Sequence, residues 1–182
     1  MKAKINRVTI QIIEGDLFAL SPSALVNATT TDLALSTEWL ANGGSELQRE
    51  CLRLGHVEVG TALMTGAGNL TVDKVIHTAG PRWGEGSERG KLMLCVLECL
   101  RLAELNKLKS IAFPAISVGT LGYPVENCAT TMITQIVDYT FEPLKHLRTV
   151  IICLGDNNTA VTFKREFQRQ LEELRETGDA KV

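Results

Sequence analysis

The alternation of compact apolar runs with stretches of helical periodicity is the feature that most constrains the fold of this chain. In its last third, Ser110–Pro114 and Thr149–Leu154 are almost wholly apolar, whereas Val125–Tyr139 and Thr159–Leu174 repeat apolar side chains at helical spacing. Buried strands separated by helices are typical of a largely parallel sheet covered on both faces. The pattern therefore predicts an α/β fold.

The first two thirds of the chain fit the same architecture. Lys91–Leu105 has the clearest helical period, and the alternating Ile and Val residues of Ile5–Ile13 predict a first strand. Further predicted elements are a helical turn at Asp16–Leu20, strands at Ala24–Asn27, Thr61–Thr65 and Lys74–Thr78, and a helix at Ser45–Leu54. No repeat or linker interrupts them, so we expect one three-layer α/β/α domain over residues 1–175 and a frayed tail over residues 176–182.

Composition limits the classes of partner. The 182 residues include 19 basic and 21 acidic side chains, for a net charge of -2. Proteins that bind duplex DNA usually carry a basic excess, because phosphate contacts dominate their affinity, so no DNA partner is expected. A small anionic ligand remains possible, because backbone N–H groups can hold a phosphate without Lys or Arg.

The cysteines and the apolar runs indicate the compartment. The five cysteines are scattered and form no C-x-x-C pair, so neither a disulfide framework nor a metal site is predicted. No apolar run approaches the ~18 residues that span a bilayer, and the N-terminus lacks the pattern of a secretory signal. We expect an intracellular protein, cytoplasmic or nuclear, without a membrane partner or a cofactor.

A glycine-containing loop after a buried strand is the richest candidate site. Ligands of open α/β sheets bind at the carboxyl ends of the strands. The segment Ser117-Val118-Gly119-Thr120-Leu121-Gly122 lies at such an end and leads into a helix. Its glycines and hydroxyls could present donors to a phosphate. A plain strand-to-helix turn explains the same residues, and without Gly-Lys-Ser/Thr a P-loop is not supported.

Three other segments follow predicted strands. Asp16 could accept hydrogen bonds from an exocyclic amine such as that of adenine, or merely cap the next turn. Asn27 could bind a sugar hydroxyl, or form an Asx turn. Gly43 and Gly44 could form a close-approach loop, or a helix C-cap. His77, late in a strand, is interpreted as a structural residue.

Together these segments resemble the macro domain family. The matching pieces run in order from about Ile10 to Leu174: Gly15-Asp16, Leu25-Val26-Asn27-Ala28, Gly43-Gly44, Val75-Ile76-His77-Thr78-Ala79-Gly80-Pro81, Ile111-Ala112-Phe113-Pro114-Ala115-Ile116-Ser117-Val118-Gly119 and Gly122-Tyr123-Pro124. The resemblance implies a mixed, mainly parallel sheet of six or seven strands between helices. It also implies a ligand, either ADP-ribose or a mono-ADP-ribosylated protein.

The roles that the resemblance implies are as follows. Asp16 takes the adenine amine with Leu17 packed nearby, the loop Ser117–Gly122 wraps the diphosphate, and Asn27 with Gly43-Gly44 lines the distal ribose. Family members usually place an aromatic against adenine after the last core strand. Here that stretch includes Asn157, a candidate contact, and no aromatic, and Leu121 stands where Tyr or Phe is frequent. Each departure removes a stacking contact worth ~1–3 kcal/mol.

Whether the chain is a reader or an enzyme is left open by the same comparison. In the hydrolytic members that this chain resembles, the segment that corresponds to Asn27–Thr30 reads Asn-Ala-Ala-Asn. Thr30 replaces the second Asn here. This arrangement resembles the histone-variant macro domains, which are similar to readers. Glu46 falls where some hydrolases carry an acid, although a helix N-terminus also favours it. We rank binding first and a hydrolase or deacetylase of ADP-ribose derivatives second, ahead of a single-stranded RNA or poly(ADP-ribose) binder and a purely structural scaffold.

Overall fold

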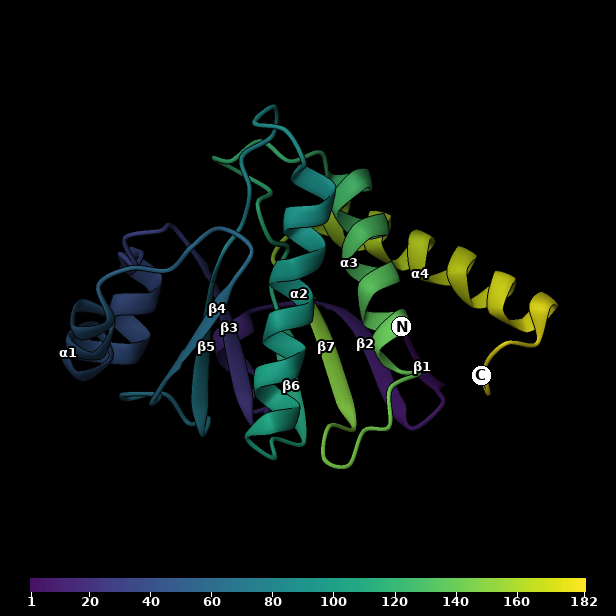
Figure 1. Cartoon of the computed structure of the whole chain (residues 1–182), viewed down its shortest axis with the longest axis horizontal. Helices are drawn as coiled ribbons and strands as arrows, with labels where there is room; N and C mark the ends of the chain where they lie inside the picture. Colours follow the sequence, from purple (N-terminus) through teal and green to yellow (C-terminus); the bar gives the residue numbers. More distant parts are fainter.

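A seven-stranded mixed sheet forms the centre of the molecule. The computed structural model describes residues 1–182, and its strands lie in the order β1-β2-β7-β6-β3-β5-β4 (Figure 1). The five inner strands pair in parallel, and the edge strands β1 and β4 run antiparallel to their neighbours. The strands are β1 Lys2–Ile5, β2 Val8–Glu14, β3 Ala24–Thr29, β4 Ala62–Thr65, β5 Lys74–Ala79, β6 Ser110–Phe113 and β7 Thr149–Leu154.

Helices cover the sheet on both sides and make three layers. On one face lie α2 Glu88–Leu105, α3 Val125–Tyr139 and α4 Asn157–Thr177, and α1 Thr37–Leu54 lies apart from them beside β3 and β4 (Figure 1). The short 3₁₀ helix η1 spans Leu17–Ala19. The predicted α/β/α architecture with a mainly parallel sheet is therefore confirmed.

The alternation along each strand separates the two larger of three apolar cores. A core of 34 buried residues fills the space between the sheet and α2, α3 and α4, and it includes Ile12, Val26 and Phe163. A smaller core of seven residues, with Leu25 and Leu47, packs α1 against the opposite face. Adjacent strand residues such as Leu25 and Val26 point to opposite faces, so both sides of β3 must be apolar.

The structure corrects two predicted elements. The first strand is a hairpin of two strands, because Asn6, at φ +54, allows the chain to reverse between β1 and β2. The helix predicted from Ser45 begins at Thr37 instead, and it passes through both glycines with a kink at Gly44. The part of α1 before Ser45 was not predicted, because the glycine pair was interpreted as a loop.

The C-terminal end of the chain lies against the turn between β1 and β2. Helix α4 continues to Thr177, and the backbone N–H of Asn6 donates to the carbonyl oxygen of Lys181 at 2.8 Å. The end of the chain is thus attached to the β1–β2 turn. No helix is both long and apolar enough to cross a membrane.

Candidate functional site

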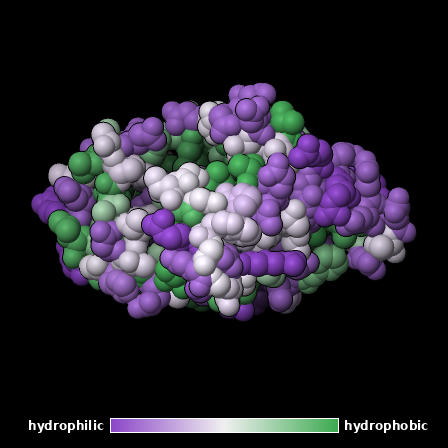
Figure 2. Space-filling model, turned by 90° about the horizontal axis from the view of Figure 1, so that it is seen from above, coloured by the Kyte–Doolittle hydropathy of each residue, from purple (hydrophilic) through white to green (hydrophobic).

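A cavity of about 820 Å³ opens at the carboxyl ends of the parallel strands. Five segments that follow β2, β3, β5, β6 and β7 contribute to its wall, together with the start of α1. Parallel strands bring these segments together because their carboxyl ends lie at the same edge of the sheet. Figure 2, viewed from above, shows this face hollowed, with apolar residues visible inside and hydrophilic ones around them.

Asp16 begins the segment after β2. Its Oδ1 accepts a hydrogen bond from the backbone N–H of Phe18 at 2.9 Å, which caps η1. The ring of Phe18 meets that of Trp39 edge to face, with centroids 4.9 Å apart. The Ser36 side chain accepts from the Trp39 N–H at 3.3 Å and so caps α1. The two aromatic rings therefore lie between the Asp16 segment and the start of α1.

The loop after β6 has unused hydrogen-bond donors. Ser117 lies in the left-handed region at φ +66, followed by Gly119 at φ +102 and Gly122 at φ +73. The N–H of Gly122 donates to the carbonyl of Gly119, whereas the N–H groups from Ser117 to Leu121 donate to no acceptor in the chain. The hydroxyl of Ser117 is buried and also without a partner. Several donors at one wall are suited to an anion.

Asn27 forms the wall at the end of β3. It is only 2% exposed, and its Nδ2 lies 3.1 Å from Nδ1 of His77 on the neighbouring strand. Burial lowers the pKa of His77 to about 4, so its ring is neutral at physiological pH. The amide of Asn27 is therefore held from behind while its residue faces the cavity.

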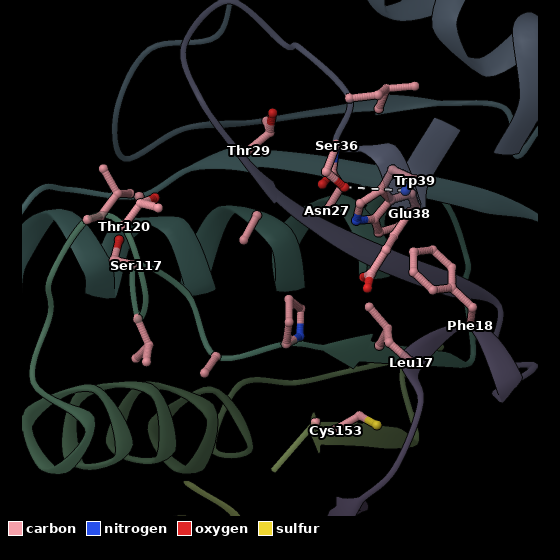
Figure 3. Close-up of a pocket in the computed structure, with 18 of the residues that line it drawn as sticks. Leu17, Phe18, Asn27, Thr29, Ser36, Glu38, Trp39, Ser117, Thr120 and Cys153 are labelled. Atoms are coloured by element: carbon pink, nitrogen blue, oxygen red, sulfur yellow. Dashed lines mark hydrogen bonds between the residues drawn. The ribbon is translucent and has the colours of Figure 1, made fainter. Parts of the chain in front are cut away.

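The charged side chains that line the cavity are acidic. Asp16 and Glu38 line it, and no Lys or Arg does. In Figure 3, Glu38 and Trp39 lie on one side near Phe18, whereas Ser117 and Thr120 lie on the other. An anionic ligand would thus have to be held by backbone N–H groups and hydroxyls. No group of three or more His, Cys, Asp or Glu side chains is arranged to hold a metal ion.

Most of the residues predicted as contacts lie together in this cavity. Those that line it are Asp16, Leu17, Asn27, Ser117, Val118, Thr120 and Leu121. Gly119 and Gly122 shape the same loop without lining the cavity. Thr30 also lines it, and its hydroxyl donates to Asp32 at 2.5 Å.

Four predicted residues lie elsewhere. Gly43 is buried within α1, where an added Cβ would lie 2.3 Å from the Leu47 side chain, and Gly44 forms the kink. Glu46 is exposed further along α1, and the Nδ2 of Asn157 donates to the Glu14 carboxylate at 3.1 Å. None of these four lines the cavity, so the glycine pair is not the close-approach loop that we expected.

The sequence reasoning also missed several lining residues. Phe18 and Trp39 supply aromatic surface. At the end of β7, where family members usually place an aromatic, Cys153 and Gly155 line the wall. Glu38 supplies the second carboxylate. The one signal for this group was Ser36, since Ser before an apolar periodic run is typical of a helix N-cap.

The comparisons with known proteins agree with this geometry. The family model described as "Macro domain" matches residues 26–132, more than half of the chain. This chain belongs to the macro domain family. The match includes most of β3, the start of α1 and the loop after β6, which together form most of the cavity wall.

Relatives of this macro domain come from archaea and bacteria. A protein of Sulfurisphaera tokodaii is 37% identical, covering 89% of this chain and 92% of the relative. The protein named O-acetyl-ADP-ribose deacetylase 1 of Pantoea vagans is 35% identical, covering 82% and 85%. An Oceanobacillus iheyensis macrodomain variant with ADPR superimposes with a TM-score of 0.88 at 25% identity, covering 94% and 98%. The likeness to histone-variant macro domains stays a prediction.

Proposed function

We propose that this macro domain binds ADP-ribose in the cavity at the carboxyl ends of its strands. The observation that carries the proposal is the group of unpaired donors in the loop after β6. Ser117 combines an unsatisfied buried hydroxyl with a left-handed backbone, and the neighbouring N–H groups are free. Buried polar groups are nearly always paired in proteins, so the buried hydroxyl of Ser117 calls for an acceptor from outside the chain. A diphosphate supplies several.

The two ends of the ligand are proposed from the positions of the flanking residues. The adenine would lie toward Asp16, whose carboxylate can accept from its exocyclic amine, with Phe18 and Trp39 adding apolar surface. The distal ribose would lie toward Asn27. A macrodomain with ADPR among the solved structures, similar over nearly the whole chain, supports the ligand class.

Calorimetric titration with ADP-ribose, ADP, AMP and NAD tests this proposal. We expect ADP-ribose to bind more tightly than AMP, because AMP offers neither the second phosphate nor the second ribose. Substituting Ser117→Ala should weaken ADP-ribose by about 3- to 10-fold, which corresponds to the loss of one hydrogen bond. The thermal stability should not fall, because the hydroxyl has no partner within the chain.

The control is Ser45→Ala, an exposed serine of α1 outside the cavity. It should change neither affinity nor stability. An unchanged affinity of the Ser117 variant, or an equal affinity for ADP-ribose and AMP, would contradict the proposed diphosphate site.

We propose, as a second function, that the domain deacetylates O-acetyl-ADP-ribose. The name of the Pantoea vagans relative, 35% identical over 82% of this chain, favours this activity. Hydrolysis of an acetyl ester needs a base that takes a proton from the attacking water. Glu38 is the better candidate than Glu46, because its carboxylate lies in the cavity and that of Glu46 lies outside.

Matched substitutions on α1 test the second function. Glu38→Gln removes the basic carboxylate at nearly constant size, and we expect the deacetylation rate to fall by about 10²- to 10⁴-fold while ADP-ribose still binds. Glu46→Gln changes the same residue type on the same helix outside the cavity and should leave the rate unchanged. Release of acetate from O-acetyl-ADP-ribose is the measurement. Equal rates in the wild type and the Glu38 variant would exclude Glu38 as the base.

The proposed partner and compartment follow from the same site. A mono-ADP-ribosylated protein could present its modification to the open cavity, and the absence of Lys and Arg from the wall argues against long nucleic acids. The five buried cysteine thiols fit the reducing interior of a cell, cytoplasmic or nuclear.

A further inference from the structure

A chain of buried polar side chains lies directly behind Asn27. Asn27 and His77 are register partners on the adjacent parallel strands β3 and β5, so their side chains emerge on the same face. Nδ2 of Asn27 lies 3.1 Å from Nδ1 of His77, and Nε2 of His77 lies 2.8 Å from Oγ1 of Thr65. Oγ1 of Thr65 also lies 2.8 Å from the carbonyl oxygen of Gly66. His77 is fully buried.

With the amide nitrogen of Asn27 toward the ring, one arrangement of protons satisfies this chain. The amide nitrogen of Asn27 can only donate, so Nδ1 of His77 must be the acceptor. The proton of the neutral ring is then on Nε2 and is donated to Thr65, whose own hydroxyl proton goes to Gly66. Each of these three hydrogen bonds then has one donor and one acceptor. The opposite tautomer would require Asn27 to rotate its amide and Thr65 to abandon Gly66.

The surroundings of His77 keep the ring neutral. The side chains that face it are Asn27 from β3, Thr65 from β4 and Cys51 from α1, whose Sγ lies 3.8 Å from Nε2. None of the three is a carboxylate. Glu50 lies near Cys51, but its Oε1 accepts from the N–H of Gly66 at 3.3 Å. Burial raises the pKa of the Cys51 thiol, so this neighbour is uncharged too.

The amide of Asn27 is the end of this chain that faces the cavity. Its Oδ1 makes no hydrogen bond within the protein and is not a solvent-inaccessible atom without a partner. Its Nδ2, in contrast, is hydrogen-bonded to His77. An amide free to rotate would present oxygen and nitrogen in turn. Held by the ring, it presents oxygen.

We propose that His77 is a positioning residue that fixes Asn27 with its carbonyl oxygen toward the ligand, so that the site accepts a hydrogen bond from a ribose hydroxyl. The inference rests on the proposed ADP-ribose site and deepens it. His77 itself does not touch the ligand. Selectivity for the distal ribose would then depend on a ring buried behind the cavity wall.

Nuclear magnetic resonance of the histidine ring nitrogens tests the proton arrangement in the unmodified protein. We expect the Nε2–H tautomer of His77 at pH 7 and a coupling across the hydrogen bond from the Asn27 amide to Nδ1. A proton on Nδ1 would overturn the proposal. This measurement needs no ligand, so it remains decisive even if ADP-ribose fails to bind and the proposed function is wrong.

Two substitutions test the consequence for binding. His77→Phe keeps a ring but removes the acceptor, and we expect ADP-ribose to bind about tenfold more weakly with ADP within about twofold of the wild type. His77→Asn places an amide oxygen near the position of Nδ1 and should restore ADP-ribose affinity to within about threefold. A merely structural role predicts equal losses for ADP-ribose and ADP in both variants, and that result would overturn the proposal.

Discussion

The two oxygens of the Asp16 carboxylate differ in their hydrogen bonding. Oδ1 caps η1 through the N–H of Phe18, and the other oxygen has no partner within the chain. The side chain is exposed at the cavity wall. One residue therefore holds the turn and leaves an acceptor available to a ligand, so its two roles can be separated by substitution.

We expect Asp16→Asn to keep the cap and to lose the charged acceptor. ADP-ribose should bind about 10- to 150-fold more weakly, because a hydrogen bond to a charged group is worth ~1.5–3 kcal/mol, while the thermal stability stays within a degree or so of the wild type. Asp16→Ala should also lose the cap, at a cost of about 0.5–2 kcal/mol. Calorimetry and thermal unfolding measure the two effects.

The ligand series provides the control for Asp16. Ribose 5-phosphate lacks adenine, so its affinity should be the same in all three proteins. Equal losses for ADP-ribose and ribose 5-phosphate would show that Asp16 does not contact the base.

The sequence alone could place the residues that directly follow strands. Asp16, Asn27 and Ser117 were found this way because strand ends are marked by an apolar run that stops. Glu38 and Trp39 could not be found in the same manner, because the start of their helix was hidden by the glycine pair. Their role depends on α1 folding back over β3, which no local pattern encodes.

At the scale of elements, α1 departs most from a regular helix. Gly44 has φ +77 and ψ -173, a region open almost only to glycine, and the helix continues on both sides of it. The N–H of Asn69 donates to the carbonyl of Gly43 at 2.9 Å, which anchors the kink to the segment after β4. Trp39 before the kink and Leu47 after it both belong to the smaller core, and Trp39 also lines the cavity.

Gly44→Ala should therefore destabilise the protein by about 1–3 kcal/mol. The new Cβ would lie 2.4 Å from Nδ2 of Asn69, and the backbone would be strained as well. Gly90→Ala is the matched control, because Gly90 lies in α2 with no atom within 4 Å of the added Cβ. It should be neutral or stabilising by up to about 1 kcal/mol. Urea unfolding measures both, and equal effects would contradict the assigned conformation of Gly44.

Elements with a regular period were predicted well. The helix Val125–Tyr139 and the strand Thr149–Leu154 have the predicted bounds, because Pro124 and the apolar run mark them clearly. Strand β1 was missed because Lys2 and Lys4 make it polar. Polar edge strands are common, since charge there discourages pairing with other chains, and they carry little of the signal that identifies a core strand.

At the scale of the whole molecule, the order of the strands could not be read from the sequence. β2 and β7 are neighbours although more than a hundred residues separate them, and β6 lies between β7 and β3. Such pairings depend on how the apolar faces of helices and strands far apart in the sequence pack against one another. The mainly parallel pairing was predictable, because a helix between two strands returns the chain to the same end of the sheet, so that the two strands run in the same direction.

The buried neutral His77 should make the stability of the whole domain depend on pH. Its pKa is about 4 in the folded state, against 6.5 as the ordinary value, so the unfolded chain takes up the proton first as the pH falls. The contribution of the neutral ring to the free energy of unfolding is complete above pH 6.5. It is lost as the pH falls toward 4, and the total loss is about 3 kcal/mol.

Urea unfolding at pH 7 and at pH 4 measures this effect. We expect His77→Asn to be less stable than the wild type at pH 7, with the difference shrinking as the pH falls. The exposed His56→Asn is the control and should show the wild-type dependence. A constant difference between the wild type and the His77 variant across this range would contradict the neutral buried ring.

The acidic, cation-free wall of the cavity affects how a ligand arrives. With Asp16 and Glu38 at its sides, the cleft exerts no long-range pull on a diphosphate, so encounter is governed by plain diffusion instead of electrostatic guidance. On the proposed mode of binding, discrimination then begins only on contact, where the phosphates would meet the unpaired N–H groups of the loop after β6. Simple phosphate and other abundant cellular anions gain little from charge alone, which leaves the cleft free for a molecule of the right shape.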